Sequence, residues 1–191
     1  LEDKCDFSQS SSLDPTEINQ WRDRVEVGNA YINRTTTGAI VRRQPFGGWK
    51  DSCVGPGSKA GGPNYVSTFF DWTEERLPQL RERPVAETRS VLCRLKSMLG
   101  ESHVQRLDAA AGSYAYWWAC EFSIEHDPSQ IHGETNHFRY RRRPWHLLRF
   151  SEDWTGDCKI NSSLIALACQ TVGTQLLLSA TQLDHELVRF A

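Results

Sequence analysis

The stretch NAYINRTTTGAIVRRQPFGGWKDSCVGPGSKAGGPNYV, residues 29–66, organises the chain. A short apolar run leads into a threonine-rich turn that closes on Gly38 and Ala39. Two clusters of glycine and proline follow, at residues 44–48 and 59–63. Such residues favour tight, non-helical turns, and glycine lets a ligand or partner approach the backbone closely. Residue chemistry alone therefore predicts a structured, functional loop region.

Composition excludes several classes of protein. The 191 residues are enough for one large domain or two small ones. The hydrophobic share of 39% and the charged share of 24% are ordinary for a soluble globular protein. A net charge of −2 argues against nucleic-acid binding. The longest apolar runs, such as residues 164–169, are too short to span a membrane, and residues 1–12 do not resemble a signal peptide.

The six cysteines are scattered and form no CxxC pair. In a chain of this length that pattern indicates reduced thiols, so we expect a cytoplasmic protein. Most of these cysteines are expected to fill the core, with Cys93 and Cys169 on apolar helix faces.

The first part of the chain is expected to start with a frayed segment, residues 1–13. A helix is predicted over residues 15–27. Asp14 supplies its N-terminal cap, Pro15 occupies the first helical position, and Glu17 places a carboxylate in the first turn. A strand over residues 29–33 follows.

The aromatic and β-branched residues 64–73 predict another strand. Residues 74–84 form a charged linker that ends at a proline. In the second half, periodicity and stop signals predict three helices, a loop and three strands. In chain order these are helices 85–99 and 102–124, loop 126–136, strands 138–143 and 145–150, helix 160–172 and strand 175–180. The last strand–helix–strand succession predicts a small βαβ unit with parallel pairing.

Two longer patterns resemble known proteins. NxYxNRxxxGAxVxxQPFGG, followed by KAGGPxY, resembles the C-terminal end of an aldehyde dehydrogenase catalytic domain, in the 1-pyrroline-5-carboxylate (L-glutamate γ-semialdehyde) dehydrogenase branch. GETNHFRYRRR, residues 133–143, is similar to the extra C-terminal domain of long proline utilization A proteins, although two further arginines displace the usual proline to Pro144.

These resemblances imply an α/β fold in two parts. Residues 14–73 would be the tail of the aldehyde dehydrogenase catalytic and oligomerisation region. Residues 85–191 would be a small Rossmann-like βαβ domain preceded by helices.

Taken alone, the residues favour a turn glycine at Gly38 and a core aromatic at Phe46. The resemblance implies more. Gly38 and Ala39 correspond to the aldehyde anchor loop, whose backbone amides hold the α-carboxylate of the substrate, with Thr37 as a weaker neighbour. Phe46 corresponds to an aromatic wall of the substrate tunnel, and Gly47 is expected to be conformational, as is the glycine after it.

In this family the cysteine nucleophile, the glutamate base and the NAD site lie upstream of the anchor loop. The resemblance thus implies that this chain holds no catalytic and no NAD-binding residue and is inactive alone. Its parent would be an NAD-dependent enzyme that oxidises L-glutamate γ-semialdehyde to glutamate in proline catabolism. Its partners would be that substrate and the remainder of the aldehyde dehydrogenase domain, and a homo-oligomer stays open.

Other interpretations of single motifs are weaker. Residues 59–63 lack the GK[ST] order of a phosphate loop. The histidines of residues 126–137 fit no metal motif, and Glu134 with Asn136 is expected to fix a loop by local hydrogen bonds. The arginines of residues 139–143 could contact nucleic acid or phosphate, but a solvated face, or pairing with acidic residues of a neighbouring domain, is favoured.

A non-enzymatic alternative remains. The aromatic face of residues 113–122 needs a surface to pack against, so the chain could act as an interaction or lid module that supports assembly or closes a tunnel.

Overall fold

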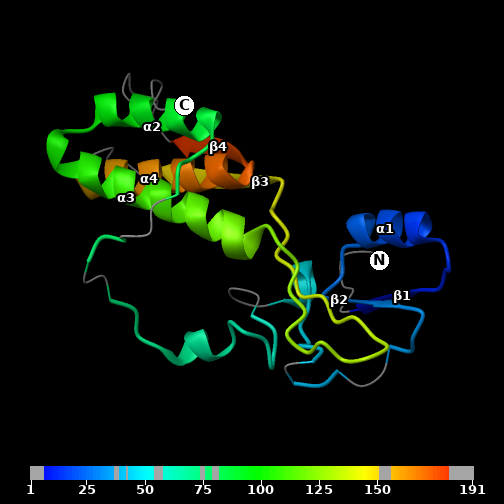
Figure 1. Cartoon of the computed structure of the whole chain (residues 1–191). Helices are drawn as coiled ribbons and strands as arrows, with labels where there is room; N and C mark the ends of the chain where they lie inside the picture. Colours follow the sequence, from blue (N-terminus) through cyan, green and yellow to red (C-terminus); the bar gives the residue numbers. More distant parts are fainter. Residues whose placement is uncertain are drawn as a thin grey trace. The chain divides into compact units, whose positions relative to one another are not determined.

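The computed structural model describes residues 7–36, 39–41, 43–53, 58–73, 76–78, 82–150 and 156–180. The chain divides into two compact units (Figure 1). The first comprises Leu1–Trp72 and His126–His137, and the second comprises Thr73–Glu125 and Phe138–Ala191. The sequence assigned all of residues 85–191 to one C-terminal domain. In the structure His126–His137 group with the first unit, and the side chains of Glu134 and Asn136 bond to Arg43 and Gln44.

The first unit begins with a strand, a helix and a second strand: β1 (Phe7–Ser10), α1 (Pro15–Arg24) and β2 (Asn29–Ile32). The two strands pair in parallel, with Phe7 opposite Asn29. Strand β2 confirms the predicted strand, and α1 confirms the predicted helix, although it ends before residue 27.

The start of α1 follows from its capping residues. The Asp14 carboxylate accepts a hydrogen bond of 2.8 Å from the backbone N–H of Thr16. Pro15 occupies the first helical position, where its missing N–H has no intrahelical partner to lose. The cap therefore fixes where the chain leaves the sheet.

Order begins earlier than the sequence indicated. The segment predicted to be frayed contains strand β1. Its exit is closed by Asn33, whose side chain donates to the carbonyl of Ser12 at 2.7 Å and accepts from the N–H of Ser12 at 3.0 Å. Ser8 and Ser10, which lie in the segment predicted to be frayed, thus pair with β2, and Ser12 bonds to the turn after β2.

The predicted strand over residues 64–73 is wrong. The chain forms a short 3-10 helix, η3 (Val66–Phe69), and a similar turn, η2 (Lys50–Ser52), precedes it. The hydroxyls of Ser67 and Thr68 each donate to the carbonyl three residues earlier, at 2.7 Å. Such local bonds compete with sheet pairing, which explains the difference.

The second unit consists of three packed helices and a parallel strand pair (Figure 1). Helix α3 runs on into a π-helical turn, η4, so the predicted helix over residues 102–124 is confirmed with a widened last turn. The elements are α2 (Ala86–Met98), α3 (Glu101–Trp117), η4 (Trp118–Phe122), β3 (Trp145–Phe150), α4 (Gly156–Val172) and β4 (Gln175–Ala180). Its apolar core consists of Leu92, Leu95, Leu107, Ala111, Phe150, Ile160 and Leu167.

The predicted βαβ unit is confirmed. Strands β3 and β4 pair in parallel, with Trp145 opposite Gln175, and α4 makes the connection. Helix α4 starts at Gly156, earlier than predicted, and ends before Gly173, which has the left-handed φ of 70° that suits glycine. The mixed α/β fold class is therefore confirmed.

The strand predicted over residues 138–143 is absent. Its side chains instead pack beside η4: Tyr140 meets the rings of Phe122 and Phe138 edge-on, with centroids 4.8 and 5.1 Å apart. These ring contacts hold the segment in an irregular path.

The five described cysteines are free thiols. Cys169 is buried, as expected, but Cys93 is exposed, so the prediction that it fills the core is wrong. Within the described part of the chain, no helix is long and apolar enough to cross a membrane.

Candidate substrate-anchoring segment

The anchor segment, residues 34–43, begins where β2 ends. Tyr31 of β2 is buried, and the guanidinium of Arg34 lies over its ring, 5.6 Å from the centroid. Between them Asn33 adopts a left-handed φ of 56°, and its N–H donates to the carbonyl of Ser10 at 3.0 Å. The chain therefore leaves the sheet at a fixed turn.

Two of the predicted anchor residues, Thr37 and Gly38, lie outside the described residues. Ala39 is described, and it is exposed. Directly after it, the carbonyl of Ile40 accepts from the N–H groups of Arg43 and Gln44, at 3.1 and 2.7 Å. The described part of the anchor thus combines an exposed small residue with a hydrogen-bonded turn.

The loop around Phe46 is held by backbone pairing. Its N–H and carbonyl bond to the carbonyl and N–H of Ala60, at 3.2 and 2.9 Å. The Asn29 carboxamide donates to the carbonyl of Pro45 at 3.0 Å and accepts from the N–H of Gly47 at 3.3 Å. These bonds leave the Phe46 ring partly exposed.

Lys59 completes this arrangement. Its ammonium group donates to the carbonyls of Gly28 at 2.7 Å and Gly47 at 3.0 Å. It therefore ties the entry of β2 to the loop around Phe46, which is a structural role and supports the rejection of a phosphate loop.

Position 48 has no room for a side chain, so glycine is required there. A methyl group there would lie 1.9 Å from the carbonyl oxygen of Ser52. This agrees with the expectation that the paired glycines are conformational.

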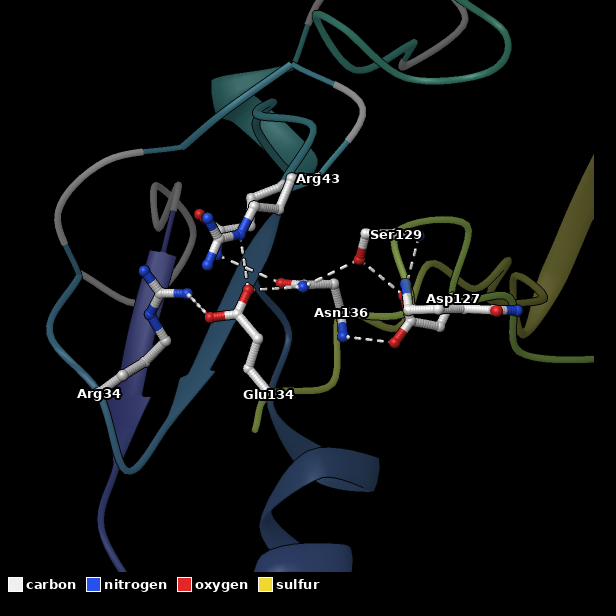
Figure 2. Close-up of polar contacts among 8 residues, drawn as sticks. Arg34, Arg43, Asp127, Ser129, Glu134 and Asn136 are labelled. Atoms are coloured by element: carbon white, nitrogen blue, oxygen red, sulfur yellow. Dashed lines mark hydrogen bonds and ion pairs between the residues drawn. The ribbon is translucent and has the colours of Figure 1, made fainter. Parts of the chain in front are cut away.

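A carboxylate from the second segment of the unit joins both ends of the anchor segment (Figure 2). Glu134 Oε1 accepts a hydrogen bond of 2.6 Å from Arg43 Nε, and Glu134 Oε2 lies 3.7 Å from Arg34 Nη1. The hydrogen bonds from Arg43 and from Asn136 lower the pKa of Glu134 to about 2. The same contact raises the pKa of Arg43. Glu134 is consequently an anion between two cations near neutral pH.

The loop that carries Glu134 is itself tightly bonded. The Asp127 carboxylate accepts from the N–H groups of Ser129, Gln130 and Asn136 at 3.0–3.1 Å, and from the Ser129 hydroxyl at 2.7 Å. These bonds lower the pKa of Asp127 to about 2. An Asx-type turn therefore fixes the loop.

Asn136 connects this loop to the anchor segment. Its amide donates to Glu134 Oε1 at 2.8 Å and to the Ser129 hydroxyl at 3.0 Å, and its oxygen accepts from Gln44 Nε2 at 3.2 Å. The local bonding predicted for Glu134 and Asn136 is confirmed. Their partners Arg43 and Gln44 were missed, because a separation of 91 or 92 residues leaves no local signal.

The other candidate motifs have structural partners. Arg139 pairs with Glu125 at 3.2 Å, and Arg142 Nη1 donates to the carbonyl of Gly173 at 3.4 Å. Arg139 thus pairs with a carboxylate, whereas Arg142 bonds to a backbone carbonyl. Among the described residues, no group of histidine, cysteine or carboxylate side chains could hold a metal ion.

Comparison with known proteins shows a family similarity for the part of the chain that contains the anchor segment. Residues 7–74 match the aldehyde dehydrogenase family model. This range contains β1, α1, β2, the anchor segment and the loop around Phe46. The sequence of residues 7–74 is therefore similar to that of aldehyde dehydrogenases.

The similarity is more specific than the family. The chain is 54% identical over 50 residues to 1-pyrroline-5-carboxylate dehydrogenase of Bacillus pumilus. The matched region covers 26% of this chain and 9% of that protein. It is 50% identical over 54 residues to the enzyme of the same name from Oceanobacillus iheyensis, covering 28% and 10%.

The solved structure of proline utilization A from Corynebacterium freiburgense is similar to the whole chain. The TM-score is 0.71 at 38% identity, and the match covers 95% of this chain and 17% of that one. Both predicted resemblances are confirmed, and the chain is proline-utilization-A-like in sequence and fold. It spans about a tenth of the curated relatives' length.

Proposed function

We propose that this chain is the substrate-anchoring part of an NAD-dependent 1-pyrroline-5-carboxylate dehydrogenase. The parent enzyme oxidises L-glutamate γ-semialdehyde to glutamate in proline catabolism. The main support is the sequence match of residues 7–74. Ala39, which the resemblance assigns to the aldehyde anchor loop, is exposed, as the proposed contact with the substrate carboxylate requires. Thr37 and Gly38 complete the proposed anchor, and Phe46 is proposed as its aromatic wall.

In this proposal the chain's own residues bind and orient the substrate. Backbone amides at Gly38 and Ala39 donate to the α-carboxylate, much as successive amides bind anions in other loops. This places the aldehyde carbon at a nucleophile contributed by other parts of the parent. Those parts would also hold NAD, which would supply the hydride acceptor for the oxidation.

The proposal implies that the chain alone is inactive, because in that family the nucleophile and the NAD site lie upstream of the anchor loop. The scattered free thiols support a cytoplasmic location for the parent.

The test is NADH formation by the longest natural gene product that contains these residues, with glutamate γ-semialdehyde and with acetaldehyde. We expect a strong preference for the semialdehyde. Ala39→Glu should abolish this preference, because a carboxylate in the anchor repels the carboxylate of the substrate. Ala86→Glu is the matched control: Ala86 is exposed at the start of α2, where a carboxylate is favourable. A parent that oxidises both aldehydes equally well would refute the proposal.

A second candidate, the interaction or lid module, is favoured by exposed aromatic residues. Phe69, Phe70 and Trp72 are 75%, 60% and 79% exposed. On the aromatic face of residues 113–122, Trp117 and Phe122 are 43% and 40% exposed. Apolar surface of this kind is typical of sites that pack against another chain or domain.

Light scattering distinguishes the two candidates for the isolated chain. The module predicts self-association that Phe69→Ser or Trp72→Ser reduces. A monodisperse monomer at all concentrations would contradict it and leave the anchoring role.

A further inference from the structure

Both ends of the anchor segment are tied to one side chain (Figure 2). Arg34 precedes the proposed anchor residues and Arg43 follows them. The two oxygens of Glu134 are divided between these arginines, at 3.7 Å from Arg34 and 2.6 Å from Arg43. Arg34 is further fixed by its position over the buried ring of Tyr31. The separation of the two ends therefore depends on Glu134.

Glu134 is itself held in place before it meets the arginines. The amide of Asn136 donates to its Oε1, and the N–H of Asn136 donates to the Asp127 carboxylate. Gln44, next to Arg43 and buried, bonds to the oxygen of Asn136. A group supported in this way can fix its partners with little loss of side-chain freedom on pairing.

We propose that Glu134 is a positioning residue for substrate binding. By holding Arg34 and Arg43 it fixes both ends of the anchor segment, and so the alignment of the Ala39 amide with the α-carboxylate of the substrate. This inference rests on the proposed function and adds to it a residue from outside the segment that matches the aldehyde dehydrogenase family.

Glu134 does not act as a proton acceptor. Both of its oxygens are engaged, and its pKa of about 2 is far below that of an effective general base near neutral pH. Its contribution is one of geometry, which predicts a particular kinetic pattern.

The first test is amide hydrogen exchange on the longest natural gene product, comparing wild type with Glu134→Gln. Exchange of residues 34–44 should become about tenfold faster, because the segment loses the charge that holds both ends. Glu125→Gln is the matched control: Glu125 pairs with Arg139 at 3.2 Å, and its side chain is 29% exposed against 27% for Glu134. Unchanged exchange in Glu134→Gln would overturn the inference, whatever the enzyme oxidises.

The second test is steady-state kinetics of the same variants. Glu134→Gln should raise the KM for glutamate γ-semialdehyde about tenfold and leave acetaldehyde oxidation unchanged, because only the first substrate carries the anchored carboxylate. Glu134→Asp, which keeps the charge, should restore part of the difference. An equal loss for both substrates would show a merely structural role and overturn the inference. A wild-type enzyme without preference for the semialdehyde would refute the proposed function instead, and exchange would then decide whether Glu134 orders the segment.

Discussion

Replacing Gly48 by alanine should destabilise the loop that follows Phe46. The new methyl carbon would lie 1.9 Å from the Ser52 carbonyl oxygen and 2.4 Å from its carbonyl carbon, where ordinary contact begins at 3.4 Å. Because these atoms belong to the backbone, no change of rotamer relieves the overlap. The turn must open, and the bonds between Trp49 and Ser52, at 2.7–3.1 Å, are strained or lost. Overpacking of this kind costs about 1–3 kcal/mol.

Thermal unfolding of the chain, followed by tryptophan fluorescence, measures this loss. A chain of this size loses about 2–4 °C in Tm per kcal/mol, so we expect Gly48→Ala to lower Tm by about 2–12 °C. Gly100→Ser is the control, since nothing lies within 4 Å of a side chain there and serine is a good cap for α3. Ser52→Ala should not rescue the variant, because the nearest atoms are those of the carbonyl. A Gly48→Ala protein that melts with the wild type would refute the steric argument.

Three further outcomes follow from the described contacts. Leu107→Ala, at a fully buried position, should cost about 2–5 kcal/mol in urea unfolding, whereas Leu147→Ala, 56% exposed, should cost less than about 1 kcal/mol; equal losses would contradict the assigned core. The folded-state pKa of Glu134 lies below its ordinary value, so its stabilisation is complete above about pH 4.5 and is lost as the pH falls toward about 2. Glu134→Gln should therefore flatten the dependence of unfolding free energy on pH in that window, and an unchanged slope would show that the ion pairs do not form. Burial raises the pKa of the Cys169 thiol, so a thiol reagent should modify exposed Cys93 first in the folded chain; equal rates would contradict the burial of Cys169.

Local signals were sufficient for most elements of the second unit. The apolar run of β4, the periodicity of α4 and the glycine between them predicted the βαβ unit and its parallel pairing. These predictions succeeded because each element buries an apolar face, and the spacing of its apolar residues can be recognised within a few positions of sequence.

The same reasoning failed at residues 64–73, where the residue types favour a strand but the backbone forms a 3-10 helix. Aromatic and β-branched residues made residues 64–73 resemble a strand, yet Phe69 and Trp72 are exposed, and hydroxyl groups bond back to the local backbone. Strand propensity reflects packing on a half-buried sheet, and the described residues offer these side chains no such surface.

The candidate site was predicted only in part. The anchor residues came from resemblance, and the loop bonds of Glu134 and Asn136 came from the chemistry of turns. The pairing of Glu134 with Arg34 and Arg43 could not be predicted. All arginines carry the same charge, and only the folded structure shows which two lie near Glu134.

The discontinuity of the first unit has a consequence for the order of folding. The βαβ unit of β3, α4 and β4 closes between residues 145 and 180, so it can form from neighbouring sequence. The hydrogen bond from Arg43 to Glu134 spans 91 residues, and the whole of α2 and α3 lies between its partners. On a ribosome the first unit must therefore wait for residues 126–137, although its own strands emerge first. Refolding should show the same sequence of events, with the helices of the second unit protected early and the anchor segment last.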